Sequence, residues 1–169
     1  NAVKYMKVPV LDFKFEDGKT IVKVNDEDIT NKIRTPEISM AASNISKLKP
    51  VREYLVELQR GMVNSTSVVM EGRDIGSVVF PNADVKIYLT ADISVRAERR
   101  KKDYEKMGNH NITLEEVANE IEKRDKQDMS RENSPLVKVE DAILLDNSNI
   151  TFEETVQEAL KIIKEKVKE

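Results

Sequence analysis

The 169-residue sequence has no cysteine, a single histidine and no apolar run near the roughly 20 residues that cross a bilayer. The absence of cysteine excludes disulfides and thiol catalysis and is compatible with a reducing compartment. His110 lies in a Gly-Asn-His-Asn loop signature without other residues at metal-ligand spacing, so we expect no histidine site. Asn1 to Lys7 lacks the basic-then-apolar order of a signal peptide. We therefore expect a cytoplasmic protein with neither a membrane span nor its own metal ligands.

An excess of positive charge is also missing. The chain has 28 lysines and arginines against 31 acidic residues, a net charge of −3. This balance argues against non-specific binding to nucleic acids or membranes as the main activity. The length allows one full hydrophobic core with a small lobe attached.

The first strong pattern predicts a β-hairpin. Residues 10–15 and 20–24 are the strands, and Asp17-Gly18 supplies the turn. The Gly-Lys-Thr at 18–20 matches the end of a phosphate-loop motif, but the position that needs the earlier glycine is Phe13. We therefore interpret these residues as a turn between strands.

The hairpin is followed by one more short predicted strand and then by helix. The strand covers residues 29–33, and the helical pattern covers 36–63. Pro50 is placed to start a helix and Gly61 to end it.

Strands and helices alternate in the rest of the chain, which favours an α/β core. Continuous apolar runs of this length are typical of parallel strands covered on both faces. Two Thr-x-x-Glu capping boxes mark helix starts at Thr113 and Thr151. The predicted strands are 68–70, 85–89 and 142–145, and the predicted helices are 94–107, 113–130 and a C-terminal helix from 151 with an apolar stripe at Val156, Ala159, Leu160 and Ile163.

Residues 68–81 are the most informative segment. A short apolar run ends at Glu71, and Arg73 and Asp74 follow before a second apolar run. In an α/β sheet, charge at the carboxyl end of a strand faces the crevice where ligands bind. An arginine flanked by carboxylates is held on one side and offers donors on the other, which suits a phosphate. The alternative is a tight turn with a surface ion pair.

Two further groups of charged residues share helix faces. The members of the first group lie three and four residues from its first arginine, and those of the second lie four and seven residues from its first arginine. For each group alone, a solvated helix surface is the alternative. Together, arginines from separate segments fit phosphoryl transfer, which depends on positioning and on neutralising phosphate charge. The groups are Arg96, Arg99 and Arg100, and Arg124, Asp128 and Arg131.

The motifs resemble those of bacterial cytidylate kinases. Residues 71–81 read E-G-R-D-I-G-S-V-V-F-P and resemble the family signature D-G-R-D-[IM]-G-T-V-V-F-P. Residues 122–131 are similar to the lid segment E-x-R-D-x-x-D-x-x-R. I-R-T-P-E at 33–37 and V-R-E at 51–53 resemble two more motifs, and all four stand in the family's order.

The resemblance implies a kinase that transfers the γ-phosphate of ATP, with Mg²⁺, to CMP or dCMP. Arg73, Arg124 and Arg131 would be catalytic residues. Glu71 stands where the family has aspartate, and the resemblance places it near the metal or the acceptor. The implied contacts are Ser43, Arg52, Asp74 and Arg131 at the cytosine edge; Arg124 and Asp128 at the ribose; Arg73 at the acceptor phosphate; and Arg99 and Arg100 at the donor phosphates.

The implied fold is a three-layer, parallel-sheet nucleoside monophosphate kinase core with a small antiparallel β insert and a helical lid. Residues 1–64 would form the monophosphate-binding lobe, and 65–169 the core, with the lid at about 95–131. Family members begin with a strand, a phosphate loop and a helix, and this chain starts where the insert should begin. We therefore expect the intact protein, a monomer, to be active and these residues alone to be inactive.

Two alternatives to this kinase remain open. A non-catalytic nucleotide-binding fragment would also lack the phosphate loop. An RNA-binding module that uses the basic residues at 96–106 is weaker, because Tyr104 is the only aromatic residue there.

Overall fold

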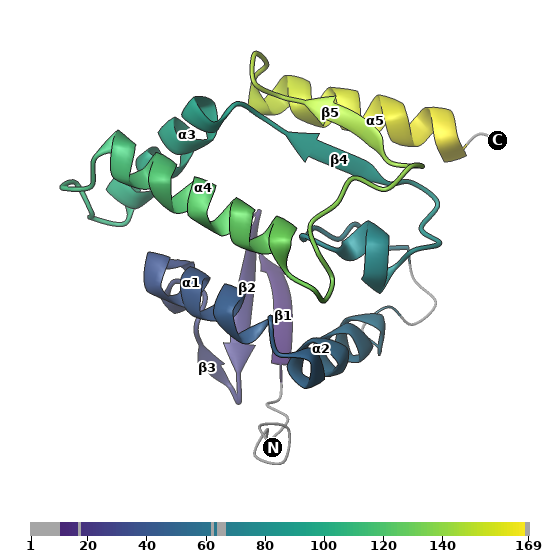
Figure 1. Ribbon diagram of the computed structural model, residues 1–169, viewed down its shortest axis with the longest axis horizontal. Helices are drawn as coiled ribbons and strands as arrows, with labels where there is room; N and C mark the ends of the chain where they lie inside the picture. The colour runs from purple at the N-terminus through teal and green to yellow at the C-terminus, as the bar shows by residue number, and fades with distance from the viewer. Residues whose placement is uncertain (1–10, 17, 62, 64–66, 168–169) are drawn as a thin grey trace. The chain divides into compact units, whose positions relative to one another are not determined.

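A computed structural model describes residues 11–16, 18–61, 63 and 67–167. The chain divides into two compact units, Asn1–Leu58 and Gln59–Glu169. Figure 1 shows their elements. No helix in these described ranges is long and apolar enough to span a bilayer.

The first unit contains a three-stranded antiparallel sheet in the order β1-β2-β3. β1 (Leu11–Glu16) pairs with β2 (Lys19–Val24), which pairs with β3 (Glu27–Asp28). The predicted hairpin is confirmed, although its residues 10 and 17 lie outside the described ranges. Gly18 has φ +73°, a left-handed conformation that glycine adopts without strain, so it lies in the turn, and Lys19 and Thr20 begin β2 instead of a phosphate loop.

The predicted strand at 29–33 is wrong. The ladder ends at Asp28, and Lys32–Arg34 forms a 3₁₀ turn. Side chains explain the ending, because Val22 N donates to the Thr30 hydroxyl (2.9 Å) and Thr30 N donates to Asp28 Oδ1 (2.9 Å). These bonds replace the backbone partners that a longer strand would need.

The helical pattern at 36–63 is confirmed as two helices, α1 (Pro36–Ile45) and α2 (Lys49–Gly61). Thr35 caps α1 by accepting a hydrogen bond from Ile38 N (3.3 Å), and Pro36 occupies the first turn, where it loses no helical bond. α2 ends at Gly61, as predicted.

The second unit contains the parallel strand pair β4 (Ile87–Thr90) and β5 (Ile143–Asp146). These strands confirm two of the three predicted apolar runs. α5 (Phe152–Val167) lies alongside the pair (Figure 1). Its predicted capping box forms, with Thr151 N donating to Glu154 Oε2 (2.8 Å) and Glu154 N donating to Thr151 Oγ1 (3.2 Å).

The third apolar run is not a strand, so the prediction for 68–70 is wrong. Neither sheet of the described residues includes this segment. A strand is stable only with a paired neighbour, and Val69 is 97% exposed rather than buried. The stripe on α5 is likewise only partly covered, since Val156 and Leu160 are exposed.

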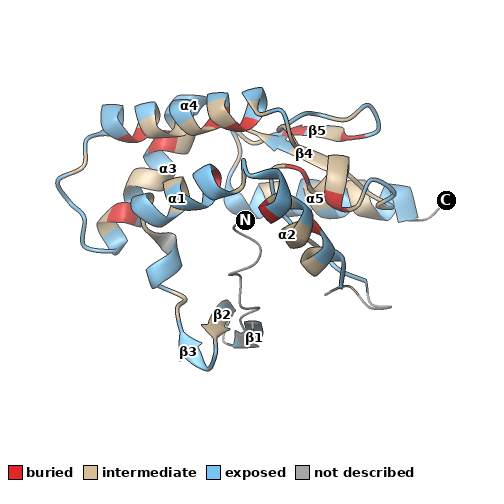
Figure 2. Cartoon of the chain, turned by 60° about the horizontal axis from the view of Figure 1, so that its bottom comes forward, coloured by how far each residue is buried: buried red, intermediate tan, exposed pale blue. Residues whose placement is uncertain are grey.

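A helix pair completes the second unit. α3 (Ile93–Lys106) packs against α4 (Leu114–Ser130) through the buried side chains of Ala97, Tyr104 and Val117. Figure 2 shows buried positions on both helices. The predicted capping box at Thr113 forms with Glu116 and fixes where α4 starts.

Candidate active site

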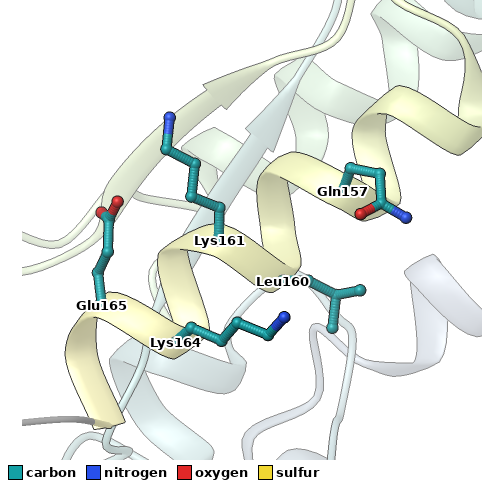
Figure 3. A pocket seen from close by; sticks show the side chains of 5 residues that line it. All are labelled: Gln157, Leu160, Lys161, Lys164 and Glu165. Atoms are coloured by element: carbon teal, nitrogen blue, oxygen red, sulfur yellow. The ribbon is translucent and has the colours of Figure 1, made fainter.

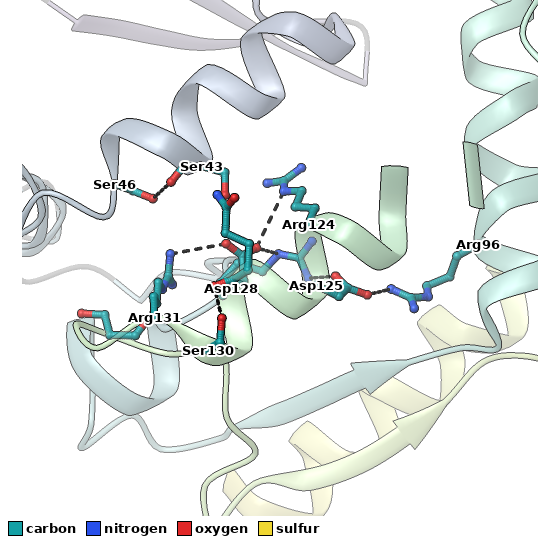
Figure 4. A network of polar contacts seen from close by, with 11 residues as sticks. Ser43, Ser46, Arg96, Arg124, Asp125, Asp128, Ser130 and Arg131 are labelled. Carbon is teal, nitrogen blue, oxygen red and sulfur yellow. Dashed lines mark hydrogen bonds and ion pairs between the residues drawn. The ribbon is translucent and has the colours of Figure 1, made fainter. Parts of the chain in front are cut away.

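One buried carboxylate, that of Asp128, gathers three arginines within the second unit. Asp128 on α4 is 2% exposed. Its oxygens lie 3.3 Å from Arg73 Nε, 3.7 Å from Arg124 Nε and 3.6 Å from Arg131 Nη1. Figure 4 shows Arg124 and Arg131 directed toward it from the same helix and its end. The structure thus brings together four residues that the sequence analysis placed in the site.

A second buried carboxylate extends this cluster. Asp125 is 8% exposed and lies one turn before Asp128 on α4. Its Oδ1 accepts a hydrogen bond from Arg73 Nη1 (3.0 Å), and its Oδ2 accepts one from Arg96 Nη1 (2.5 Å). Arg96 belongs to α3, so the cluster joins three segments that are distant in sequence (Figure 4).

The cluster is rich in arginine. Four guanidiniums meet two carboxylates in the ion pairs of Asp125 and Asp128. The pKa of Arg124 is lowered, first by burial and then by the neighbouring positive charge of Arg73. Burial also lowers the pKa of Arg131, whose side chain is only 5% exposed. Partly desolvated positive charges that repel one another favour an anionic ligand.

The residues around Arg73 differ in their surroundings. Glu71 is exposed, whereas Asp74 is 3% exposed and precedes a π-helical turn, Ile75–Val79. The Asp74 carbonyl accepts a hydrogen bond from Val78 N (2.9 Å). Because the ion pairs of Arg73 reach α4, the alternative of a local surface ion pair at this segment is wrong.

The remaining arginines of α3 have other partners. Arg99 donates to the side-chain and main-chain oxygens of Asn147 (2.9 and 2.7 Å) and to the Ile150 carbonyl (3.3 Å). Arg100 lies over the ring of Tyr104, 5.3 Å from its centroid. The structure therefore does not bring these two arginines into the ion pairs around Asp128.

Two predicted site residues belong to the first unit. Ser43 on α1 is 5% exposed, and its carbonyl accepts a hydrogen bond from the Ser46 hydroxyl (2.9 Å; Figure 4). Arg52 lies on α2 and is half-buried. Their assignment to the cytosine edge stays a prediction.

Asp125, a fixed position of the lid motif, and Arg96 were not among the predicted site residues. A signal for Asp125 was present, because it lies three residues before Asp128 and so falls on nearly the same helix face. No sequence spacing relates Asp125 to Arg73, 52 residues away, or to Arg96, 29 residues away. Those contacts depend on how α3, α4 and residues 71–74 pack.

A pocket in the second unit lies apart from the predicted site residues. A pocket of about 290 Å³ lies along α5, lined by Gln157, Leu160, Lys161, Lys164 and Glu165 (Figure 3). None of these is a predicted site residue. Among the residues that the structure describes, no three acidic or histidine side chains group as a metal site.

The sequence of the chain is similar to those of known proteins. A cytidylate kinase family profile matches residues 3–165. A cytidylate kinase from Lactobacillus johnsonii is 47% identical over 158 residues, which cover 94% of this chain and 68% of the relative. The cytidylate kinase of Thermosipho melanesiensis is 46% identical over 96% of this chain and 73% of the relative, and that of Thermotoga petrophila is 41% identical over 99% and 76%. These matches favour the predicted enzyme over the non-catalytic alternative. The chain belongs to the cytidylate kinase family.

Proposed function

We propose that the intact protein transfers the γ-phosphate of ATP to CMP or dCMP and so produces CDP or dCDP. The observation that carries this proposal is the arginine cluster around Asp125 and Asp128 in a chain of this family. Its guanidinium groups suit a phosphorylated ligand, because each can donate hydrogen bonds to phosphate oxygens and neutralise their charge.

The transfer needs little covalent chemistry from the protein. An oxygen of the acceptor phosphate is already ionised at neutral pH and attacks the γ-phosphorus, while the bond to the departing ADP oxygen breaks. No general base is required, so the protein's part is to position the two nucleotides and neutralise charge. Arg73 would hold the acceptor phosphate, because its guanidinium keeps donors beyond those engaged by Asp125 and Asp128 and its side chain is 35% exposed.

Buried groups would select the nucleoside. Arg131, fixed near Asp128, would donate to the O2 and N3 acceptors of cytosine, together with Arg52 and Ser43. The carboxylate of Asp74 would accept from the cytosine N4 amino group, whereas uracil has a carbonyl there. Arg124 and Asp128 would hold the ribose hydroxyls.

Donor binding is proposed for α3 and for the metal that accompanies ATP. Arg99 would exchange its bonds to Asn147 and Ile150 for phosphate contacts, and Arg100 would approach from the next position of the helix. Mg²⁺ is commonly held by one or two carboxylates and by the phosphates of its substrate. Glu71, which is exposed, is the acid of the chain that would lie near the metal or the acceptor phosphate, and the metal would neutralise phosphate charge.

We also propose which part of a nucleoside monophosphate kinase fold each unit forms. The second unit would be part of a three-layer nucleoside monophosphate kinase core, with α3 and α4 as its lid, and the first unit would be the monophosphate-binding lobe. We also propose that the intact protein is a cytoplasmic monomer.

A coupled assay of ADP release by the full-length protein tests the activity. CMP and dCMP should be phosphorylated faster than AMP and UMP at equal concentration, and omission of Mg²⁺ should abolish the signal. Equal rates with CMP, AMP and UMP would refute the assignment of a cytidine-selective kinase.

A further inference from the structure

The charged cluster contains a residue to which the proposed mechanism gives no role, Asp125. It is 8% exposed, and each of its two carboxylate oxygens accepts a hydrogen bond from a different arginine. A buried carboxylate whose partners come from residues 71–74 and from α3 does more than stabilise its own helix. From these contacts we infer that Asp125 is a positioning residue, which sets the orientation of Arg73 and links it to α3.

The geometry at Arg73 supports this role. Asp125 holds Nη1 at 3.0 Å, and Asp128 lies 3.3 Å from Nε. Two carboxylates on separate atoms of one planar guanidinium fix both its position and the direction of its remaining donors. With Asp128 alone, the group could rotate about its Nε contact.

The second partner of Asp125 explains the link to α3. Arg96 Nη1 contacts the other oxygen of the same carboxylate, so one negative group lies between two guanidiniums. Without the negative charge between them, Arg73 and Arg96 would repel each other in a partly buried setting. Neutralising Asp125 should therefore displace both arginines.

The role rests on the proposed function, because Arg73 is the residue proposed to hold the acceptor phosphate. The first test is Asp125→Asn in the full-length protein. The KM for CMP should rise about tenfold to a hundredfold, as expected for the loss of a hydrogen bond to a charged group, while the KM for ATP changes less than threefold. Calorimetric binding of CMP without ATP should weaken by the same factor, which gives a readout independent of turnover.

A double-mutant cycle separates positioning from general stability. If Asp125 acts through Arg73, then Asp125→Asn should raise the KM by less than about twofold in an Arg73→Ala background. A purely structural role would lower the active fraction, and thus kcat, with an unchanged KM for CMP, and its effect would persist in that background. Either result would overturn the inference.

Glu122→Gln is the matched control. Glu122 lies on the same helix, and its carboxylate pairs with the exposed Lys126 (3.2 Å), so the same change of charge should leave KM and kcat unchanged. If Asp125→Asn does not fold, Asp125→Glu is the second variant, because it keeps the charge but displaces it by a methylene. It should raise the KM for CMP in the otherwise wild-type protein but not in the Arg73→Ala background.

The two proposals can fail separately. Wild-type protein that does not phosphorylate CMP would overturn the proposed function. Active wild-type protein whose Asp125→Asn variant keeps the wild-type KM for CMP would overturn only the role of Asp125.

Discussion

Charged residues are used differently in the two units of the molecule. In the first unit, Glu27 and Lys32 form a local ion pair in which both side chains are about two-thirds exposed. In the second unit, the side chains of Asp128 and Arg131 are 3% and 5% exposed, and Asp128 also meets Arg73 from a distant segment. Burying charge is costly, so a fold that retains several buried charges in one place marks that place as functional.

The largest effect on stability is expected when the central carboxylate of the buried cluster, that of Asp128, is removed. Asp128→Ala should lower the free energy of unfolding by about 3–5 kcal/mol, because it removes the buried carboxylate that pairs with Arg73, Arg124 and Arg131. Urea denaturation followed by circular dichroism measures the loss. A change below about 1 kcal/mol would mean that the buried pair does not stabilise the second unit.

The next largest effect concerns ligand binding. Arg131→Ala should raise the KM for CMP more than tenfold, since a hydrogen bond to a charged group contributes about 1.5–3 kcal/mol. Steady-state kinetics with CMP as the varied substrate measure it, and the KM for ATP is the internal control. An unchanged KM and kcat for CMP would remove Arg131 from the acceptor site.

A helix cap gives a moderate effect that does not depend on buried charge. Thr113→Ala should lower the free energy of unfolding by about 1 kcal/mol, because the Thr113 hydroxyl accepts the Glu116 N–H (3.2 Å) at the start of α4. Thermal unfolding checks it, with Thr113→Ser as the control that keeps the hydroxyl. Equal losses in both variants would contradict the capping role.

The smallest effect should come from the exposed pair of the first unit. Its hydrogen bond lowers the pKa of Glu27 and raises the pKa of Lys32 from their ordinary values. Any stabilisation is therefore lost as the pH falls through the folded pKa of Glu27 or rises through that of Lys32. Because both side chains are exposed, Lys32→Ala should leave the melting temperature at pH 7 unchanged within error. A clear decrease in the melting temperature would mean that this exposed ion pair also stabilises the fold, which would contradict the contrast with the buried pairs of the second unit.

Local sequence signals predicted much of this structure. Asp-Gly turns, Pro and Gly at helix ends and Thr-x-x-Glu boxes act within a few residues, and the elements that they predict are present. The strands predicted at 29–33 and 68–70 are absent, because strand formation depends on a partner and on competing side-chain bonds. Likewise, the helix-face spacing of Arg124, Asp128 and Arg131 was visible in the sequence. The bridge from Asp125 to Arg73 and Arg96 was not, since packing alone brings those residues together.

The capping box at Thr113 also has a consequence for the tolerance of α4 to insertions. A helix advances about 100° per residue, so the fixed start at Thr113 sets the angular phase of every later side chain. One residue inserted between 117 and 123 would turn both aspartates away from Arg73 without changing the composition of the cluster. A four-residue insertion would nearly restore their direction but move them about 6 Å along the axis. We therefore expect this part of the chain to tolerate inserted residues only in the loop before the cap.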